Sequence, residues 1–274
     1  MRESARRQYW RPSACAAPRD AAMTAGSAGH PRATVLGCEI DALGMEQTLY
    51  RCEELIETRG FAQHVAINAA KLVAMRDDAD LRAIVAACEL VNADGQAIVW
   101  ASRILGDPLP ERVAGVDLME RLFERSAAKG YRVYILGARA EVLEQAVARF
   151  RERYPALVLA GYRDGYFSDD ESAAVAEEVR SARPDILFVA ISSPRKEYWL
   201  GRYGRDLGVP FVMGVGGSID VAGASPVAPR QRSSVSGSSG SSGCSRSRAA
   251  SSAATPRPTR GSSCSWPTSS GAGE

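Results

Sequence analysis

The chain has 274 residues, of which 45% are hydrophobic and 24% are charged, and its formal net charge is +2. These values suit a globular chain of one or two domains and exclude the strongly basic surface of a nucleic-acid-binding protein. The six cysteines show no CxxC spacing and the only histidines are His30 and His64, so neither a zinc site nor a disulfide framework is expected. No apolar run approaches the roughly 18 to 20 residues of a membrane-spanning helix.

The two ends of the chain differ in composition from the middle. Residues 224–273 contain no Asp, Glu, Leu, Ile, Phe, Tyr or Met, so this stretch cannot form a core and is expected to be disordered. The Arg-rich start is either a flexible leader or upstream DNA translated from a wrong start codon, and we favour the second, with Met23 as the true start. We expect a cytoplasmic protein with a disordered leader (1–32), an α/β domain (33–223) and a disordered low-complexity tail (224–274).

Between these ends, short apolar runs alternate with amphipathic helical patterns. In chain order the pattern predicts a strand at 34–36, a helix at 45–58, a strand at 62–67, a helix at 78–87, a strand at 89–92, helices at 96–105 and 117–129, a strand at 132–136, a helix at 140–154, a strand at 156–160, a helix at 169–182 capped by Ser168, a strand at 185–191, a helix after Pro194 and a strand at 210–213. The alternation predicts an α/β fold with a mainly parallel, Rossmann-like sheet covered by helices on both faces.

Ligands of such sheets bind at the carboxyl ends of the strands, where two polar loops are candidates. Asp94 follows an apolar strand and precedes Gly95, a position that suits a general base, although Asp94 alternatively caps the helix near Gln96. Arg112 lies in a loop before a helix whose expected cap is Asp117. Its guanidinium either binds a phosphate or carboxylate or forms a surface ion pair.

Three further loops carry small or charged residues at strand ends. Gly137 either opens a phosphate-binding turn or packs closely against a neighbour. Gly214–Gly217 either wraps a nucleotide diphosphate, with Asp220 accepting from sugar hydroxyls, or forms a turn with positive φ. The loop at 193–199 combines a proline, two cations, a carboxylate and a tryptophan, and we favour a functional role over a solvated helix start.

Taken together and in order, these residues resemble the bacterial WecG/TagA/CpsF glycosyltransferase family, which makes lipid-linked intermediates of surface polysaccharides. The resemblance runs from about Thr34 to Gly223. Its matching segments are Asn68-Ala69, Asp94-Gly95, Glu111–Asp117, Ile135–Gly137, Gly165–Phe167, Ser193–Glu197 and Gly214–Asp220.

The resemblance implies an inverting transfer, without metal or cofactor, of N-acetylmannosamine or a related uronic sugar from a UDP-sugar to a polyprenyl-diphosphate-linked sugar. Asp94 would deprotonate the acceptor hydroxyl, Asn68 would position the acceptor or donor sugar, and Arg112 would offset charge on the departing diphosphate. The resemblance also implies a set of substrate-binding residues: Gly95, Gly137, Ser193, Pro194, Lys196, Glu197, Gly216, Gly217 and Asp220.

Two features depart from the family pattern. Many relatives carry Pro-Lys-Gln-Glu where this chain has Pro194-Arg195-Lys196-Glu197, and the cation at Lys196, if its side chain touches the donor, favours an acidic donor sugar. The family's C-terminal Arg-Ala-Pro and Gly-Leu-Glu-Trp segment, thought to contact the membrane, is absent after Gly223. Peripheral attachment to the inner face of the membrane is therefore expected only of a chain with the native C-terminus.

The C-terminal departure has a simple candidate explanation in the coding sequence. One permitted back-translation of residues 224–240, read two bases later, gives Leu-Thr-Arg-Arg-Ala-Pro-Ala-Ala-Val-Gln-Arg-Leu-Gly-Leu-Glu-Trp. We hypothesise a frameshift near Gly223. The nucleotide sequence of the coding DNA would show whether it is present. A chain without this segment would transfer poorly, and the apolar surface left uncovered makes a homo-oligomer one of the expected states.

Two other classes of protein compete with the transferase. One is a non-catalytic nucleotide-sugar or dinucleotide-binding module, in which Asp94 is only a cap, or an inactive truncated transferase. The other is a Rossmann-like oxidoreductase. The absence of GxGxxG and of a Tyr-x-x-x-Lys set disfavours the oxidoreductase.

Overall fold

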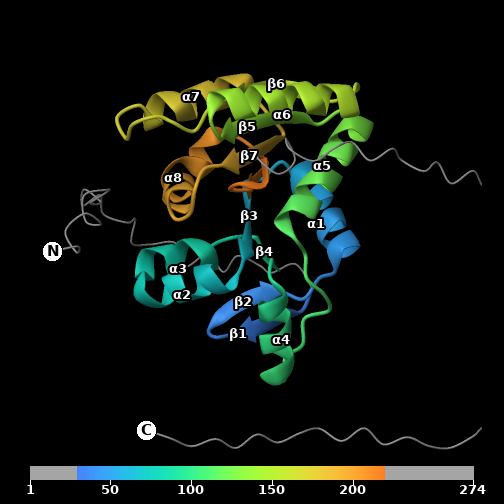
Figure 1. Cartoon of the computed structure of the whole chain (residues 1–274), viewed down its shortest axis with the longest axis vertical. Helices are drawn as coiled ribbons and strands as arrows, with labels where there is room; N and C mark the ends of the chain where they lie inside the picture. Colours follow the sequence, from blue (N-terminus) through green and yellow to red (C-terminus); the bar gives the residue numbers. More distant parts are fainter. Residues whose placement is uncertain (1–29, 220–274) are drawn as a thin grey trace, which may run out of the picture. The chain divides into compact units, whose positions relative to one another are not determined.

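The computed structural model describes residues 30–219, and Figure 1 shows the arrangement of their helices and strands. Residues 1–29 of the expected leader, the expected tail and Asp220 lie outside the described residues, whereas Arg32, the last residue of the expected leader, already belongs to a strand. The elements are, in chain order, β1 (Arg32–Val35), β2 (Cys38–Asp41), α1 (Met45–Thr58), β3 (Ala62–Ile67), α2 (Ala69–Asp77), α3 (Ala79–Ala86), β4 (Leu90–Ala93), α4 (Gln96–Ile104), α5 (Gly115–Lys129), β5 (Arg132–Gly137), α6 (Ala140–Arg153), β6 (Val158–Arg163), α7 (Ser172–Ala182), β7 (Ile186–Ala190), α8 (Arg195–Tyr203), the 3-10 helix η1 (Gly204–Leu207) and β8 (Phe211–Gly214).

Six of the strands form one parallel sheet in the order β4-β3-β8-β7-β5-β6. The α/β class expected from the sequence is thereby confirmed. All six carboxyl ends lie at the same edge of the sheet, which is where the candidate loops begin.

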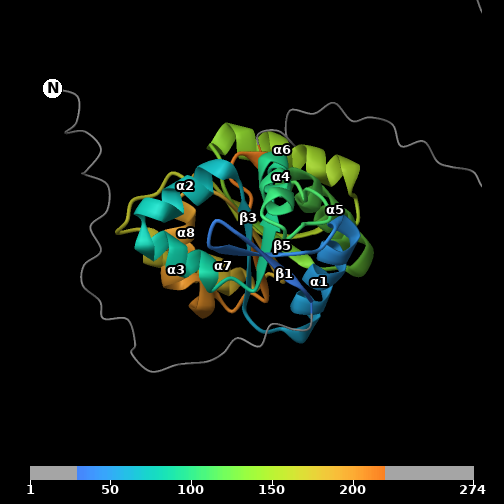
Figure 2. The same ribbon diagram turned by 90° about the horizontal axis from the view of Figure 1, so that it is seen from below.

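Helices cover both faces of this sheet because successive residues of a strand point to opposite sides. Along β7, Ile186 and Phe188 pack in a cluster with α1, α5 and α6, whereas Leu187 and Val189 pack in another with α7 and α8. A third cluster joins the β1-β2 hairpin to β3, β4 and the helices α2, α3 and α4. Figure 2 shows the same unit turned by 90°, with α4 close to the hairpin.

The single strand expected at 34–36 is wrong, because Leu36 and Gly37 form a turn with positive φ between two antiparallel strands. A helix that the sequence reading missed, α2, precedes α3. Its buried face consists of only Lys71, Leu72 and Met75, which is too short an apolar pattern to be recognised.

Two expected helix caps are also wrong. The helix α5 starts with Ala114 as its cap, so that Asp117 lies in the first turn instead. The helix α7 starts at Ser172, not Asp169, and Ser168 forms a turn in which its hydroxyl accepts from the N–H of Glu171 at 3.3 Å.

Candidate active site

The strand order determines which candidate residues meet at the carboxyl edge. Along this edge, neighbouring strands lie roughly 4.8 Å apart. The loops follow one another as Asp94 after β4, Asn68 after β3, Val215–Gly217 after β8, Ile191–Pro194 after β7, Ala138–Arg139 after β5 and Asp164–Tyr166 after β6. Residues more than a hundred positions apart in the sequence are therefore neighbours.

Asp94 sits at the end of β4 and its carboxylate faces the start of α5. Its backbone N–H donates to the carbonyl of Ile67 at 2.8 Å, and a Cβ at Gly115 would lie 3.4 Å from its Oδ2 atom. The cap of α4 is Gly95, with no side-chain cap, so Asp94 does not cap this helix. The Asp94 side chain has no hydrogen-bond partner between residues 30 and 219, and the start of α5 favours a negative charge beside it.

Asn68 lies next to Asp94 on the neighbouring strand. A Cβ at Gly95 would lie 3.9 Å from the Asn68 Cα, so the two loops touch. The Asn68 side chain is exposed, and its Oδ1 accepts from the N–H of Lys71 at 2.9 Å, which caps α2. Its amide nitrogen is a donor and has no hydrogen-bond partner among the described residues.

The loop before α5 brings Arg112 to the same region. The N–H of Val113 donates to the carbonyl of Ala93 at 2.9 Å, and Glu111 Oε1 accepts from the N–H of Met45 at 2.6 Å, so the loop is fixed on both sides of Arg112. Arg112 itself is exposed and forms no ion pair within residues 30–219. The surface ion pair considered above is therefore not formed in this part of the chain.

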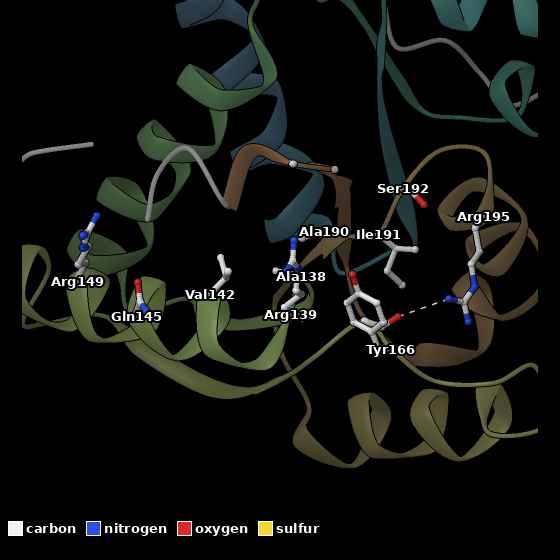
Figure 3. Close-up of a pocket in the computed structure, with 13 residues that line it drawn as sticks. Ala138, Arg139, Val142, Gln145, Arg149, Tyr166, Ala190, Ile191, Ser192 and Arg195 are labelled. Carbon is white, nitrogen blue, oxygen red and sulfur yellow. Dashed lines mark hydrogen bonds between the residues drawn. The ribbon is translucent and has the colours of Figure 1, made fainter. Parts of the chain in front are cut away.

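A pocket of about 840 Å³ opens at the ends of β5, β6, β7 and β8. One wall is α6, along which Figure 3 shows Arg149, Gln145, Val142 and Arg139 in a row. The other lining residues are Ala138, Gly165, Tyr166, Ala190, Ile191, Ser192, Arg195, Gly216 and Gly217.

The charge of this pocket is positive. Among the described residues that line it, three are arginines and none is acidic. The Nη1 atom of Arg149 is buried without a hydrogen-bond partner in the described part of the chain. The first N–H groups of α6, which have no acceptor within the helix, add to the positive potential beside Arg139. Such a cavity favours an anionic ligand.

Small residues let the strands meet beneath the pocket. A Cβ at Gly137, whose φ is +134°, would lie 2.4 Å from the backbone of Ala190, and one at Gly165 would lie 3.0 Å from the Cα of Gly137. The N–H of Ala138 donates to the carbonyl of Ala190 at 3.0 Å. Gly137 therefore packs under the pocket, and the N–H after it is occupied.

Arg195 separates this pocket from a second cavity of about 680 Å³ on the other side of its side chain. Its guanidinium donates to the carbonyls of Gly165, at 3.5 Å, and of Phe167, and it lies 4.9 Å from the Phe167 ring centroid. Figure 3 shows the contact with Gly165 as a dashed line near Tyr166. The preceding Ser193 and Pro194 are exposed.

Lys196 and Glu197 point inward and form a buried triad with Lys71. Glu197 Oε1 lies 2.7 Å from Lys71 Nζ and 2.9 Å from Lys196 Nζ, and the three side chains are only 1% to 8% exposed. Burial opposes ionisation of Glu197, but the two ammonium groups outweigh it and bring its pKa to about 2. Burial and the neighbouring Lys71 lower the pKa of Lys196. Because a Cβ at Gly214 would lie 2.8 Å from Lys196 Cε, that glycine provides room for the lysine stem.

The structure thus sorts the candidates into three places. Asn68, Asp94, Gly95 and Arg112 gather at β3 and β4, and Gly216 and Gly217 line the arginine-rich pocket. Lys196 and Glu197 lie buried between these regions, next to the end of β8. The sequence reading missed Lys71 and Arg149; a lysine on the apolar face of α2 was the only signal for the first.

The fold and the pocket define a class: an open parallel α/β protein with an arginine-lined cavity at the carboxyl edge of its sheet. Sequence comparison adds the family. Residues 33–235 match the glycosyl transferase WecG/TagA/CpsF family, and the chain belongs to that family of glycosyltransferases, which confirms the resemblance seen in the motifs.

One relative is an N-acetylglucosaminyldiphosphoundecaprenol N-acetyl-beta-D-mannosaminyltransferase of Bacillus spizizenii. It is 32% identical to this chain over 139 residues, which are 51% of this chain and 53% of the relative. The matched region is therefore about half of the relative's length. None of the helices between residues 30 and 219 has the length and apolarity needed to span a bilayer.

Proposed function

We propose that this chain transfers N-acetylmannosamine, or a related uronic sugar, from a UDP-sugar to a polyprenyl-diphosphate-linked sugar in surface-polysaccharide synthesis. Membership of a glycosyltransferase family supports sugar transfer. The name of the Bacillus relative combines a mannosaminyl group with an undecaprenol-diphosphate-linked N-acetylglucosamine, which supports the choice of substrates.

The arginine-rich pocket is the proposed UDP site. Its volume of about 840 Å³ is within the usual range for small-molecule sites. Arg139 and the first N–H groups of α6 suit a diphosphate, and Arg149, about 15 Å further along the helix, adds positive charge to the same wall. Tyr166, which is 75% exposed at the pocket rim, offers an aromatic face to the uracil ring.

Asp94 is the proposed general base, and the observation that carries this role is that its carboxylate, at the carboxyl edge of the sheet, has no hydrogen-bond partner among residues 30–219. The acceptor hydroxyl attacks the anomeric carbon and its proton passes to Asp94, while the carbon–oxygen bond to UDP breaks and UDP leaves with the electron pair. Attack from the face opposite UDP inverts the anomeric centre. Asn68 positions a sugar, and Arg112 offsets charge on the departing diphosphate.

The preference for a uronic donor depends on the buried triad. It contains two ammonium groups and one carboxylate, so its net charge is positive. Since Lys196 is bonded to Glu197, the positive charge that would attract an acidic sugar belongs to the triad as a whole, which lies next to Gly214. Ser193, Pro194 and Asp220 remain proposed contacts of the donor.

The experiment is the substitution Asp94→Asn, assayed with UDP-N-acetylmannosamine and its uronate. We expect transfer to fall about 10²- to 10⁴-fold, because general base catalysis contributes that much, while UDP affinity stays unchanged. Asp206→Asn is the matched control. Asp206 is an exposed acid in η1, whose first residue Gly204 lies against Phe61 at the amino end of the sheet.

The outcomes separate the competing classes. Transfer by Asp94→Asn at the wild-type rate would remove Asp94 from the mechanism. A wild-type chain that binds UDP-sugar and transfers nothing would instead indicate the binding module or the inactive truncated transferase.

A further inference from the structure

The loop that carries Tyr166 lies beyond the paired part of β6. It comprises residues 164–167, and Tyr166 itself is 75% exposed. The N–H of Gly165 donates to the carbonyl of Ala138 at 3.0 Å, and the N–H of Tyr166 donates to Asp164 Oδ1 at 2.9 Å. The Tyr166 ring, which is the proposed stacking surface for uracil, therefore depends on a small number of loop contacts for its position.

Arg195, the first residue of α8, supplies further contacts of this loop. Its guanidinium donates to the carbonyls of Gly165, at 3.5 Å, and of Phe167, so it bonds the residue on each side of Tyr166. Figure 3 shows the bond to Gly165 beside the Tyr166 ring. The guanidinium also lies 4.9 Å from the centroid of the buried Phe167 ring, which packs edge-on against Trp199 of α8. The loop is thus tied to α8 through one side chain.

The position of Arg195 is unfavourable for the helix that contains it. A cation in the first turn of a helix lies at the positive end of the helix dipole. No carboxylate between residues 30 and 219 forms an ion pair with Arg195 to offset this cost. The contacts that it makes are those with the 164–167 loop, so its benefit lies in that loop and not in α8.

We propose that Arg195 is a positioning residue for nucleotide binding. By bonding both neighbours of Tyr166, it holds the tyrosine ring where a base can stack on it. The planar guanidinium can lie over the Phe167 ring and donate to two carbonyls at once. An ammonium group is compact and has no plane, so a lysine at this position would not reproduce the three contacts. The inference rests on the proposed UDP site.

A direct bond to the diphosphate is the competing role, because Arg195 also lines the arginine-rich pocket. The two roles differ in their effect on a ligand without a base. A positioning role acts through Tyr166, so it influences the affinity for UDP but not for inorganic diphosphate, and it disappears once the ring is removed. A direct bond to phosphate would influence both ligands, with or without the ring.

The test is calorimetry of the full chain with UDP and with inorganic diphosphate, using Arg195→Lys, Tyr166→Ala and the double variant. In Arg195→Lys we expect UDP affinity to fall about three- to tenfold, approaching the loss expected on removal of the ring, and diphosphate affinity to stay unchanged. In the double variant, UDP affinity should equal that of Tyr166→Ala alone, because two residues that act as a unit are not additive.

Arg202→Lys is the matched control for this experiment. Arg202 lies on the same helix, and its guanidinium is 5.2 Å from the Tyr203 ring centroid, but it does not line the arginine-rich pocket. The control should leave the affinities for UDP and diphosphate unchanged.

Hydrogen exchange gives a second readout, which does not depend on nucleotide binding. Without the bonds from Arg195, the 164–167 loop should open more often, so the N–H of Gly165 should exchange about tenfold faster in Arg195→Lys than in the wild type. Exchange within β5 should not change, because its N–H groups are held by the sheet.

Three results would overturn the proposal: unchanged UDP affinity in Arg195→Lys, equal weakening of UDP and diphosphate, or additive losses in the double variant. The second and third would assign Arg195 to a direct phosphate contact. If the wild type does not bind UDP, the proposed UDP site fails, and hydrogen exchange then tests the loop contact by itself. Faster exchange at Gly165 would support the holding of the loop by Arg195, and unchanged exchange would overturn it.

Discussion

The two parts of the sheet's carboxyl edge are built in different ways. At β3 and β4, the loops present single polar side chains beside the start of α5, among them Asp94, which has no hydrogen-bond partner in the described part of the chain. At β5 to β8, the loops contain glycines and leave a cavity of about 840 Å³ lined by arginines.

This difference indicates that substrate binding and proton transfer can be assigned to different parts of the same sheet edge. Recognition of a nucleotide diphosphate needs volume and several donors, which small residues and a helix start provide. Proton transfer needs one carboxylate that no protein group has already engaged. Between the two parts, the triad of Lys71, Glu197 and Lys196 connects α2, which Asn68 caps, to α8, which follows β7.

The largest expected effect comes from breaking this connection with Glu197→Gln. The substitution keeps the shape of the side chain and leaves two buried ammonium groups uncompensated, so we expect a loss of about 3 to 5 kcal/mol in the free energy of unfolding. Urea denaturation at pH 7 measures it. Glu177→Gln, an exposed acid on α7 paired with Arg180, should change stability by less than about 0.5 kcal/mol.

The pH dependence checks the cause of this loss. The pKa of Glu197 is about 2 in the folded protein, below its ordinary value of 4.5, so its contribution is present above pH 4.5 and disappears as the pH falls toward 2. The wild type and the variant should therefore converge in stability over this range. A difference that stays constant on acidification would mean that packing, not charge, holds the triad together.

The parts of the fold that could be predicted are those whose signal is local. The helix Met45–Thr58 and the strand Ala62–Ile67 coincide with their predicted limits because apolar periodicity fixes both. The hairpin was missed because its turn contains Leu36 at a position where Asn or Asp would have predicted a hairpin turn. The order of the strands brought the polar loops to one edge, as the parallel fold requires.

The remaining features of the site depend on contacts that no local pattern records. Lys71 and Glu197 are 126 residues apart in the sequence, so their ion pair follows only from the strand order. From sequence alone, the helix face with Arg149 and Gln145 would be predicted to be exposed to solvent. In the structure, the loops after β7 and β8 form the opposite side of a pocket that this face lines. For Gly137, by contrast, the sequence allowed either a phosphate-binding turn or close packing. Its contact with Ala190 shows close packing.

A smaller effect is expected from His64, which lies in β3 beneath the Asn68 and Asp94 loops. Its Nε2 lies 3.0 Å from Asn92 Oδ1, and burial lowers its pKa from 6.5 to about 4. The unfolded chain therefore binds a proton that the folded protein excludes, so stability is complete above pH 6.5 and falls toward pH 4, by up to about 3 kcal/mol.

His64→Gln separates this histidine from other titrating groups. The glutamine amide retains a donor for Asn92 but does not titrate between pH 4 and 6.5. Urea denaturation at intervals across this range should show a much shallower loss of stability in the variant. An identical slope in both proteins would assign the acid sensitivity to other side chains, since Glu197 acts only below pH 4.5.

The smallest expected effect concerns Tyr166 at the rim of the arginine-rich pocket, and it isolates recognition from chemistry. Removing the ring in Tyr166→Ala should weaken UDP binding about tenfold, because stacking of a base on an aromatic side chain contributes roughly 1 to 3 kcal/mol. Inorganic diphosphate has no base, so its affinity, measured by calorimetry alongside that of UDP, should not change. Transfer at saturating donor should also persist, because Asp94 is untouched.

Tyr50→Ala removes another exposed ring, from α1, and should leave both affinities as they are. Equal weakening of UDP and diphosphate by Tyr166→Ala would show that the substitution distorts the 165–167 loop held by Arg195, and the division between a binding region and a catalytic region would then lose its support at this residue.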